Sequence, residues 1–204
     1  MIKIVSSTLT SLIAGLVLAS NVQANAPRDR SDFAEIFAFH LGQEWVAFDK
    51  EQAQREFIHD SAEALILEGE YFFHPYFSYT VGVALLSYDD KASYSQKTTG
   101  GYKSSSSRGI PIYGDVGYKQ FFGANARTYI TLRTGVSVMT VSDRSITDCT
   151  DCHAEDIDID GGIYAMAGAG VRFAKSWTVG LRYKSYFSGD MDNAVGIGFS
   201  YGFR

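Results

Sequence analysis

The chain has 204 residues, of which 46% are hydrophobic, 20% charged and 14% aromatic, and its formal net charge is −5. This length suits one domain, and the apolar content is sufficient for a folded core, which excludes a disordered chain. The acidic balance gives no electrostatic reason to expect a nucleic-acid partner. Beyond the N-terminus no apolar run reaches the roughly 18–20 residues of a membrane-spanning helix, which excludes helical membrane proteins but not membrane barrels.

The first 24 residues have the pattern of a secretory signal peptide. Lys3 supplies a positive start, Leu9–Ala19 is apolar, and residues 22–24 (VQA) form a small-residue cleavage pattern. We predict cleavage after Ala24, with a signal peptide over residues 1–24 and one exported domain over residues 25–204. An uncleaved membrane anchor is the alternative, although the apolar stretch is short for that role.

From residue 33 onward, apolar and small or polar residues alternate with period two, which is typical of strands. In the last stretch, Val195, Ile197 and Phe199 alternate with glycine and serine. We predict eight strands, at about 33–45, 62–73, 76–89, 109–122, 127–142, 159–174, 176–188 and 193–204. Their connections alternate between long and short, as in barrels with short periplasmic turns and long outer loops. The predicted fold is therefore all-β, an eight-stranded antiparallel up-and-down transmembrane β-barrel.

Aromatic residues gather near the strand ends, as expected at the two interfaces of a membrane. The loop-side group is Trp45, Phe48, Tyr88, Tyr113, Tyr186 and Phe187. A soluble lipocalin-like carrier would have the same alternation but with its apolar face inward. The aromatic groups and the many glycines on the polar face favour the membrane barrel, and the carrier remains the alternative.

Charged residues within the predicted strands fall on the face opposite the apolar one. A Lys or Arg facing lipid near mid-membrane would cost about 2–4 kcal/mol, so we assign these residues to the lumen. They are Glu35, Glu68, Glu70, Asp115, Lys119, Arg133, Arg172, Arg182 and Lys184. The nearly balanced signs predict an internal salt-bridge network, with a proton or ion path as the alternative. Side chains fill the lumen of an eight-stranded barrel, so we expect no large aqueous pore.

The chain resembles the small eight-stranded bacterial outer-membrane barrels, a group that includes OmpA transmembrane domains, OmpX and Ail type proteins and opacity-type surface proteins. The resemblance rests on the signal peptide, the strand count, the loop alternation and the segments AGAGVRF, TVGLRY and VGIGFSYGF. It implies a bacterial outer-membrane location, with outer-membrane lipid, lipopolysaccharide and the outer-membrane assembly machinery as partners. It also implies surface loops for envelope integrity, adhesion or a host or surface ligand, without catalysis or cofactor.

The third long loop contains two motifs. Cys149 and Cys152 face an oxidising exterior, so we predict a disulfide, with free thiols or a metal half-site with His153 as alternatives. Asp156, Asp158 and Asp160 match the opening of a calcium loop, but the twelfth position is Ala167 rather than a bidentate glutamate. The alternative is an extended sixth strand in which the three aspartates share the lumen-facing parity of Gly162 and Tyr164.

Barrels of this group include enzymes that modify lipid A, which is the alternative function. A deacylase would have a His and Ser pair near the end of the seventh strand, where residues 184–188 (KSYFS) contain no histidine. His59, Asp60 and Ser61 have the residue types of a palmitoyltransferase, but they are contiguous in the first loop rather than spread over loops. We therefore predict no catalytic residues.

Overall fold

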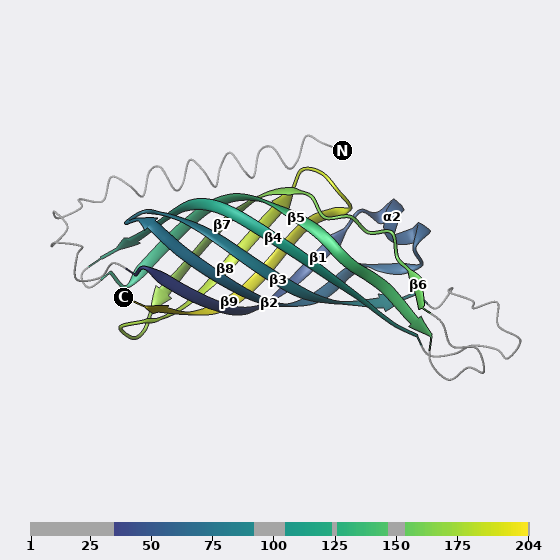
Figure 1. The fold of residues 1–204 in the computed structure, drawn as a ribbon, viewed down its shortest axis with the longest axis horizontal. Coiled ribbons are helices and arrows are strands. Elements are labelled where there is room, and N and C mark those ends of the chain that lie inside the picture. The colour runs from purple at the N-terminus through teal and green to yellow at the C-terminus, as the bar shows by residue number, and fades with distance from the viewer. Residues whose placement is uncertain (1–34, 92–104, 124–125, 147–153, 204) are drawn as a thin grey trace, which may run out of the picture. The chain divides into compact units, whose positions relative to one another are not determined.

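The computed structural model describes residues 35–91, 105–123, 126–146 and 154–203 (Figure 1). The predicted signal peptide and the two cysteines, Cys149 and Cys152, lie outside these residues, so both remain predictions. Among the described residues, no helix has the length and apolar character needed to cross a membrane.

The described residues form nine strands and one short helix. Their bounds in chain order are β1 (Phe37–Phe48), α2 (Lys50–Arg55), β2 (Ile58–His74), β3 (Phe77–Asp90), β4 (Ser105–Phe122), β5 (Thr128–Ile146), β6 (Ala154–Asp156), β7 (Ile163–Arg172), β8 (Trp177–Tyr186) and β9 (Met191–Phe203). The helix α2 begins at the capping residue Asp49, whose carboxylate accepts hydrogen bonds from the backbone N–H groups of Glu51 and Gln52.

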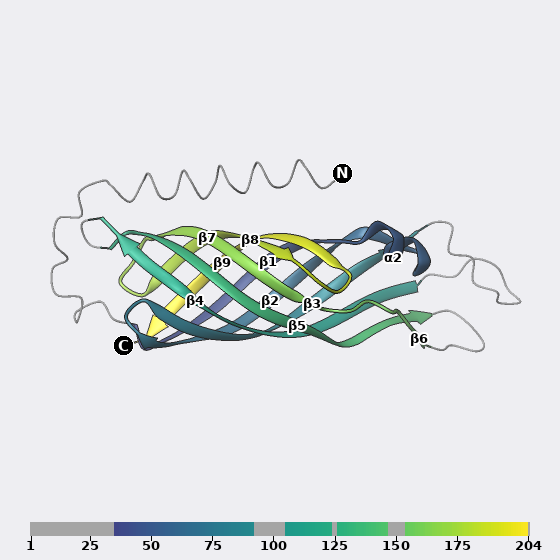
Figure 2. The same ribbon diagram turned by 90° about the horizontal axis from the view of Figure 1, so that it is seen from above.

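The long strands form one sheet that closes on itself (Figures 1 and 2). The strand order is β4-β3-β2-β1-β9-β8-β7-β5, and the β4–β5 ladder joins the two ends. All of these pairs are antiparallel. The short strand β6 adds three residues beside the end of β5. The predicted eight-stranded antiparallel barrel is confirmed.

The side chains alternate between a buried inner face and an exposed outer face, and the outer face is apolar. On β8, Trp177 and Leu181 are 45% and 64% exposed, whereas Thr178 and Lys184 are 1% and 2% exposed. A barrel in water would place its charges outside and its large apolar groups inside. The observed arrangement is the inverse, which suits a wall that faces lipid.

Several strands reach farther toward the loops than predicted. The β4–β5 ladder runs from Phe122 and Thr128 to Ser105 and Ile146. In contrast, the β8–β9 ladder ends at Ser185. Figures 1 and 2 show β4 and β5 extending well beyond the turn between β8 and β9. The polar residues at these strand ends resemble loop sequence, yet they are paired in the sheet. The prediction from composition therefore ended these strands several residues too early on the loop side.

The prediction that residues 159–162 extend the sixth strand is wrong, because β7 begins at Ile163. Ile157 and Ile159 turn into the barrel and are 3% and 2% exposed, whereas Asp156, Asp158 and Asp160 are exposed. The predicted facing of the aspartates is therefore reversed. Burial of the two isoleucines accounts for the reversal, because each removes a large apolar side chain from water.

The predicted loop-side aromatic group is also only partly an outer belt. Trp45 and Phe187 are exposed at 49% and 68%. Phe48, Tyr88 and Tyr113 point inward instead and are at most 4% exposed. These three side chains belong to the interior of the barrel rather than to its lipid-facing surface.

Candidate functional site in the barrel lumen

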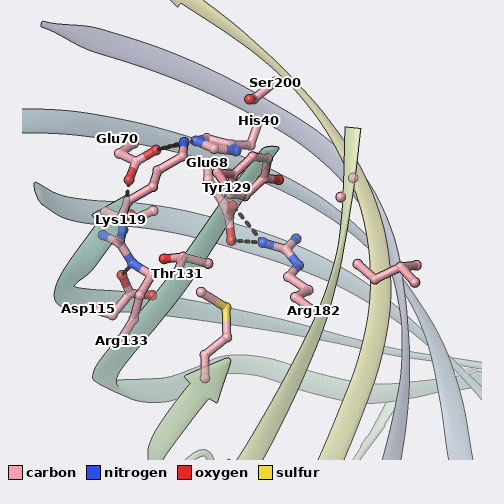
Figure 3. Close-up of a pocket in the computed structure, with 15 residues that line it drawn as sticks. His40, Glu68, Glu70, Asp115, Lys119, Tyr129, Thr131, Arg133, Arg182 and Ser200 are labelled. Carbon is pink, nitrogen blue, oxygen red and sulfur yellow. Dashed lines mark hydrogen bonds and ion pairs between the residues drawn. The ribbon is translucent and has the colours of Figure 1, made fainter. Parts of the chain in front are cut away.

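Glu70 on β2 is the centre of the polar interior. Its Oε1 accepts hydrogen bonds from Arg133 Nη1 at 2.7 Å and Ser78 Oγ at 2.7 Å. Its Oε2 accepts from Lys119 Nζ at 3.0 Å and lies 2.9 Å from His40 Nε2 (Figure 3). With 1% of its surface exposed, Glu70 therefore depends on these partners for the compensation of a buried charge.

A second group of charges surrounds Arg182 on β8. Its Nη1 donates to both carboxylate oxygens of Glu68 at 2.7 Å (Figure 3), and its Nε lies 2.7 Å from Glu44 Oε1. Glu44 also pairs with Lys184 Nζ at 3.0 Å. The hydroxyl of Tyr113 donates to Glu68 at 2.8 Å. Two carboxylates and two cations thus neutralise one another between β1, β2 and β8.

Asp115 on β4 connects the two sides of the lumen. It pairs with the Nε of Arg133 and accepts a hydrogen bond from the hydroxyl of Tyr164 at 2.7 Å.

Near the short turns, Arg172 Nη2 donates to Glu35 Oε1 at 2.6 Å. The guanidinium carbon of Arg172 lies 4.1 Å from the centroid of Phe121, in the geometry of a cation–π contact.

The structure places all nine predicted lumen charges inside the barrel and brings them into ion pairs. Sequence reasoning missed two further members, His40 and Glu44. Both lie on β1, whose two faces are apolar at its start. Both are even-numbered, as are Ala38 and Gly42 on the same strand. Because alternate residues of a strand share a face, this parity could have assigned them to the lumen.

With Glu44 included, this charge network holds five carboxylates and five Lys or Arg side chains, apart from the buried pair Arg144–Asp90 nearer the loops. The carboxylates are Glu35, Glu44, Glu68, Glu70 and Asp115, and the cations are Lys119, Arg133, Arg172, Arg182 and Lys184. The formal charges cancel when His40 is neutral. A buried charge without a partner is costly, so this balance is what permits so many charges in one lumen.

Above the network, toward the long loops, the buried side chains are mainly apolar, with the ion pair Arg144–Asp90 as a charged exception. This apolar plug consists of Val46, Phe48, Ala53, Ile58, Ala62, Ala64, Ile66, Ala84, Leu86, Tyr88, Tyr113, Ile157, Ile159, Tyr164, Met166, Met191 and Ala194. Phe48 and Tyr88 meet edge to face at 5.5 Å between ring centroids. The plug combines strand residues with residues from the loop-side connections.

Those connections form a lid, which we define as residues 49–57, 157–162 and 187–190. The Asp49 N–H donates to Asp190 O at 2.8 Å, and Asp160 N donates to Asp190 Oδ2 at 2.7 Å. The side-chain amide of Gln52 on α2 donates to the carbonyl of Asp158. Three separate connections are thus linked to one another across the loop-side opening of the barrel.

A cavity of about 60 Å³ lies within the polar network (Figure 3). Its walls come from all eight long strands and include His40, Thr131, Arg182 and Ser200. A water molecule occupies about 30 Å³ in the liquid, so the cavity suits a few waters or one small ion. It is far too small for the passage of a nutrient-sized solute.

The other predicted site residues are not assembled into a site among the described residues. Asp156, Asp158 and Asp160 are exposed, and no group of three or more metal-ligating side chains occurs in the part of the chain that is described. His59, Asp60 and Ser61 are exposed neighbours in β2, at a shift in the β2–β3 register, and are not gathered from separate elements around a pocket. That arrangement does not bring the three together as a catalytic relay.

Comparisons with known proteins agree with this geometry. The family model described as "Outer membrane protein beta-barrel domain" matches residues 11–203. No curated protein sequence matches the chain. Among solved structures, Neisserial surface protein A aligns with a TM-score of 0.50 and 10% identity, over 82% of this chain and 96% of that one. This likeness supports the fold.

Two other solved structures align with lower scores. The attachment invasion locus protein Ail of Yersinia pestis has a TM-score of 0.48 and 9% identity, over 82% of this chain and 96% of that one. The outer membrane protein OprG of Pseudomonas aeruginosa has a TM-score of 0.45 and 14% identity, over 84% and 97%. The family match spans nearly the whole barrel, and the chain therefore belongs to the outer membrane protein beta-barrel family.

Proposed function

We propose that this protein is a closed outer-membrane barrel that presents its loop side at the bacterial surface, where it serves envelope integrity, adhesion or binding of a host or surface ligand. The observation that supports this role is the filled interior. The charge network occupies the lumen, and the apolar plug and the lid lie above it. A barrel with this interior is suited to presentation rather than to transport of solutes.

The lid supports a role in binding at the surface, because it provides a folded surface on the loop side. α2 is capped by Asp49, and its Ala53 is fully buried in the plug. Outward-facing residues of α2, including Lys50, Glu51 and Arg55, are exposed. A partner would thus meet a helix whose backbone is held by packing, which reduces the entropy that binding must overcome.

The apolar outer wall supports contact with outer-membrane lipid, and lipopolysaccharide is the expected lipid around the loop-side ends. We also propose assembly by the outer-membrane insertion machinery, which membership of the family supports. We propose no catalysis, because the residue types of lipid A enzymes do not converge at a described site.

Two experiments test this function. The first places single cysteines at Gln54 in α2 and at Lys175 in the turn between β7 and β8, in a chain with Cys149→Ser and Cys152→Ser. A membrane-impermeant maleimide added to intact cells should label the Gln54→Cys variant and leave the Lys175→Cys variant unlabelled until the outer membrane is permeabilised. Labelling of only the Lys175→Cys variant would reverse the proposed orientation.

The second experiment measures conductance in planar bilayers, with a general porin in the same bilayers as the positive control. The intact barrel should insert without stable conductance steps, because the described lumen offers no continuous aqueous path. Reproducible steps that scale with salt concentration would overturn the closed-barrel role. Binding of the wild-type surface to host or bacterial ligands can then be compared with that of cells lacking the protein.

A further inference from the structure

Arg144, near the loop-side end of β5, ties the lid to the barrel wall. Its side chain is 4% exposed. The Nε donates to Asp90 Oδ1 on β3 at 2.9 Å, and the Nη2 donates to the carbonyl of Glu56 in the lid at 2.7 Å. Because the guanidinium is a planar fork of donors, one side chain holds the wall and the lid at a fixed spacing. Asp90 also accepts a hydrogen bond from Ser107 Oγ at 2.8 Å, which orients the carboxylate toward Arg144.

Arg144 thereby connects elements that are distant in the chain. Glu56 is the C-cap residue of α2, so its carbonyl lies at the helix end, where the backbone carbonyls lack partners within the helix. The side chain of Asp90 is 12% exposed, and a carboxylate with so little access to water depends on a cation for compensation. On another side, Arg144 Nη1 lies 3.7 Å from Glu155 Oε2 on β6. Loss of the guanidinium would therefore break contacts to β3, to the end of α2 and to β6 together.

Phe57, the residue that joins α2 to β2, has a strained backbone. Its φ is +56°, and Phe57 and Ala126 are the non-glycine residues with positive φ in the described chain. This region is unfavourable for a bulky side chain. The ring is 46% exposed, so burial compensates only part of the cost. Strain of this kind persists where the surrounding contacts determine the backbone. Here the contacts are those of Arg144 to the Glu56 carbonyl and of the Lys91 N–H to the Phe57 carbonyl at 2.8 Å.

The body of α2 is bound mostly within the lid and the plug. The side-chain amide of Gln52 donates to the carbonyl of Asp158, which also belongs to the lid. Ala53 is fully buried in the plug. The first contact stays within the lid, and the second is apolar and not directional. Arg144 thus supplies a directional tie from this segment to the wall, next to the strained residue.

We propose that residues 49–57 form a releasable strap over the plug, which Arg144 holds closed and which hinges at Phe57. When the bond from Arg144 to the Glu56 carbonyl breaks, Phe57 returns to a negative φ and α2 leaves the plug, while the strands below remain paired. Because the strap carries the exposed face of α2, its release regulates the surface on which the proposed function rests. The strap itself needs no partner, so its failure and the failure of the surface role are distinguishable.

Hydrogen exchange of the full chain in micelles, monitored by mass spectrometry, tests the tie. In Arg144→Gln the amides of α2 should exchange at least about tenfold faster, with exchange in β8 and β9 unchanged, because release is local. The matched control is Arg108→Gln. Arg108 lies on the neighbouring strand β4 and pairs with Asp143 through Nε and Nη2, but it is exposed. Unchanged α2 exchange in Arg144→Gln, equal acceleration in Arg108→Gln, or equal acceleration in β8 and β9 would overturn the proposal.

Arg144→Lys provides the test if Arg144→Gln does not fold. Lysine keeps a positive charge opposite Asp90 but does not reproduce the planar fork that also reaches the Glu56 carbonyl. The amides of α2 should therefore exchange faster than in the wild type, although the barrel retains its charge pair. Exchange of α2 at the wild-type rate in a folded Arg144→Lys variant would refute the tie.

The hinge is tested by two substitutions that both remove the ring of Phe57. Glycine adopts a positive φ readily, whereas the Cβ of alanine disfavours it, so Phe57→Gly removes the strain and Phe57→Ala keeps it. The amides of α2 should exchange roughly tenfold more slowly in Phe57→Gly than in Phe57→Ala. Phe57→Gly combined with Arg144→Gln should exchange more slowly than Phe57→Ala combined with Arg144→Gln. Equal exchange in the glycine and alanine variants would show that residue 57 stores no strain, and the hinge would be refuted.

Discussion

Glu70 on β2 and Arg133 on β5 meet inside the barrel, with 2.7 Å between Oε1 and Nη1. Their strands are not neighbours in the sheet, because β3 and β4 lie between them. The ion pair therefore spans the lumen rather than a strand ladder. Four further groups converge on this pair: Lys119, His40, Ser78 and Asp115.

Removing Glu70 should strongly destabilise the barrel. Glu70→Ala leaves Lys119 and Arg133 without their shared carboxylate, and breaking such a buried pair costs about 3–5 kcal/mol. The measurement is the free energy of unfolding in micelles, obtained from a denaturant titration. Heat-modifiable gel mobility reports the folded fraction. Glu63→Ala is the control, since Glu63 is exposed on the same strand and should lose no more than about 1 kcal/mol. Equal losses of stability for the two variants would show that the buried Glu70 contributes no more to stability than an exposed carboxylate.

Gly180 on β8 and Gly198 on β9 are paired in the sheet and give a second prediction. A Cβ at Gly180 would collide with the hydroxyl of Tyr129 and lie 2.9 Å from the Ala169 carbonyl oxygen, whereas a Cβ at Gly198 would make only ordinary van der Waals contacts, the nearest at 3.5 Å. We expect Gly180→Ala to destabilise by about 1–3 kcal/mol through overpacking and Gly198→Ala to be tolerated. Tyr129→Phe should partly rescue Gly180→Ala in a double-mutant cycle. A larger loss from Gly198→Ala than from Gly180→Ala would contradict the packing described.

The plug should control the local stability of the lid. Ile157→Ala and Ile159→Ala remove apolar contacts that hold the residues around α2, so the amides of α2 should exchange hydrogen faster in both variants. Hydrogen exchange monitored by mass spectrometry checks this outcome. Val138→Ala, on the exposed outer face of β5, is the control and should leave α2 exchange unchanged. Unchanged exchange in all three variants would mean that the lid is stable without the plug.

The apolar outer wall predicts a depth-dependent cost for a charge. Leu181 is 64% exposed in the middle of β8, and Leu181→Arg should destabilise the inserted barrel by about 2–4 kcal/mol. Phe187→Arg, just beyond the loop-side end of β8, should cost about 0–1 kcal/mol because it lies near the interface. Unfolding measured in lipid vesicles compares the two. A larger loss of stability from Phe187→Arg than from Leu181→Arg would show that Phe187 lies nearer the centre of the bilayer than Leu181.

The sequence by itself determined the barrel and the content of its interior. Period-two alternation places Arg182 and Lys184 on one face of a strand and Leu181 and Tyr183 on the other, because successive side chains in a strand point in opposite directions. The stretches with this alternation determined the strand count, and the alternation of long and short connections indicated a membrane barrel. For the same reason all nine predicted lumen charges lie inside.

Only the tertiary structure decided which charges pair and what closes the loop side. The partners of Glu70 come from β1, β3, β4 and β5, so their meeting depends on closure of the barrel and not on any local spacing. Glu44 was missed because the start of β1 is apolar on both faces, which obscured the parity that Glu44 shares with the buried Ala38. Ile157 turned inward because the plug offered it burial, and a long-range apolar contact of that kind overrides the local alternation on which the sequence prediction relied.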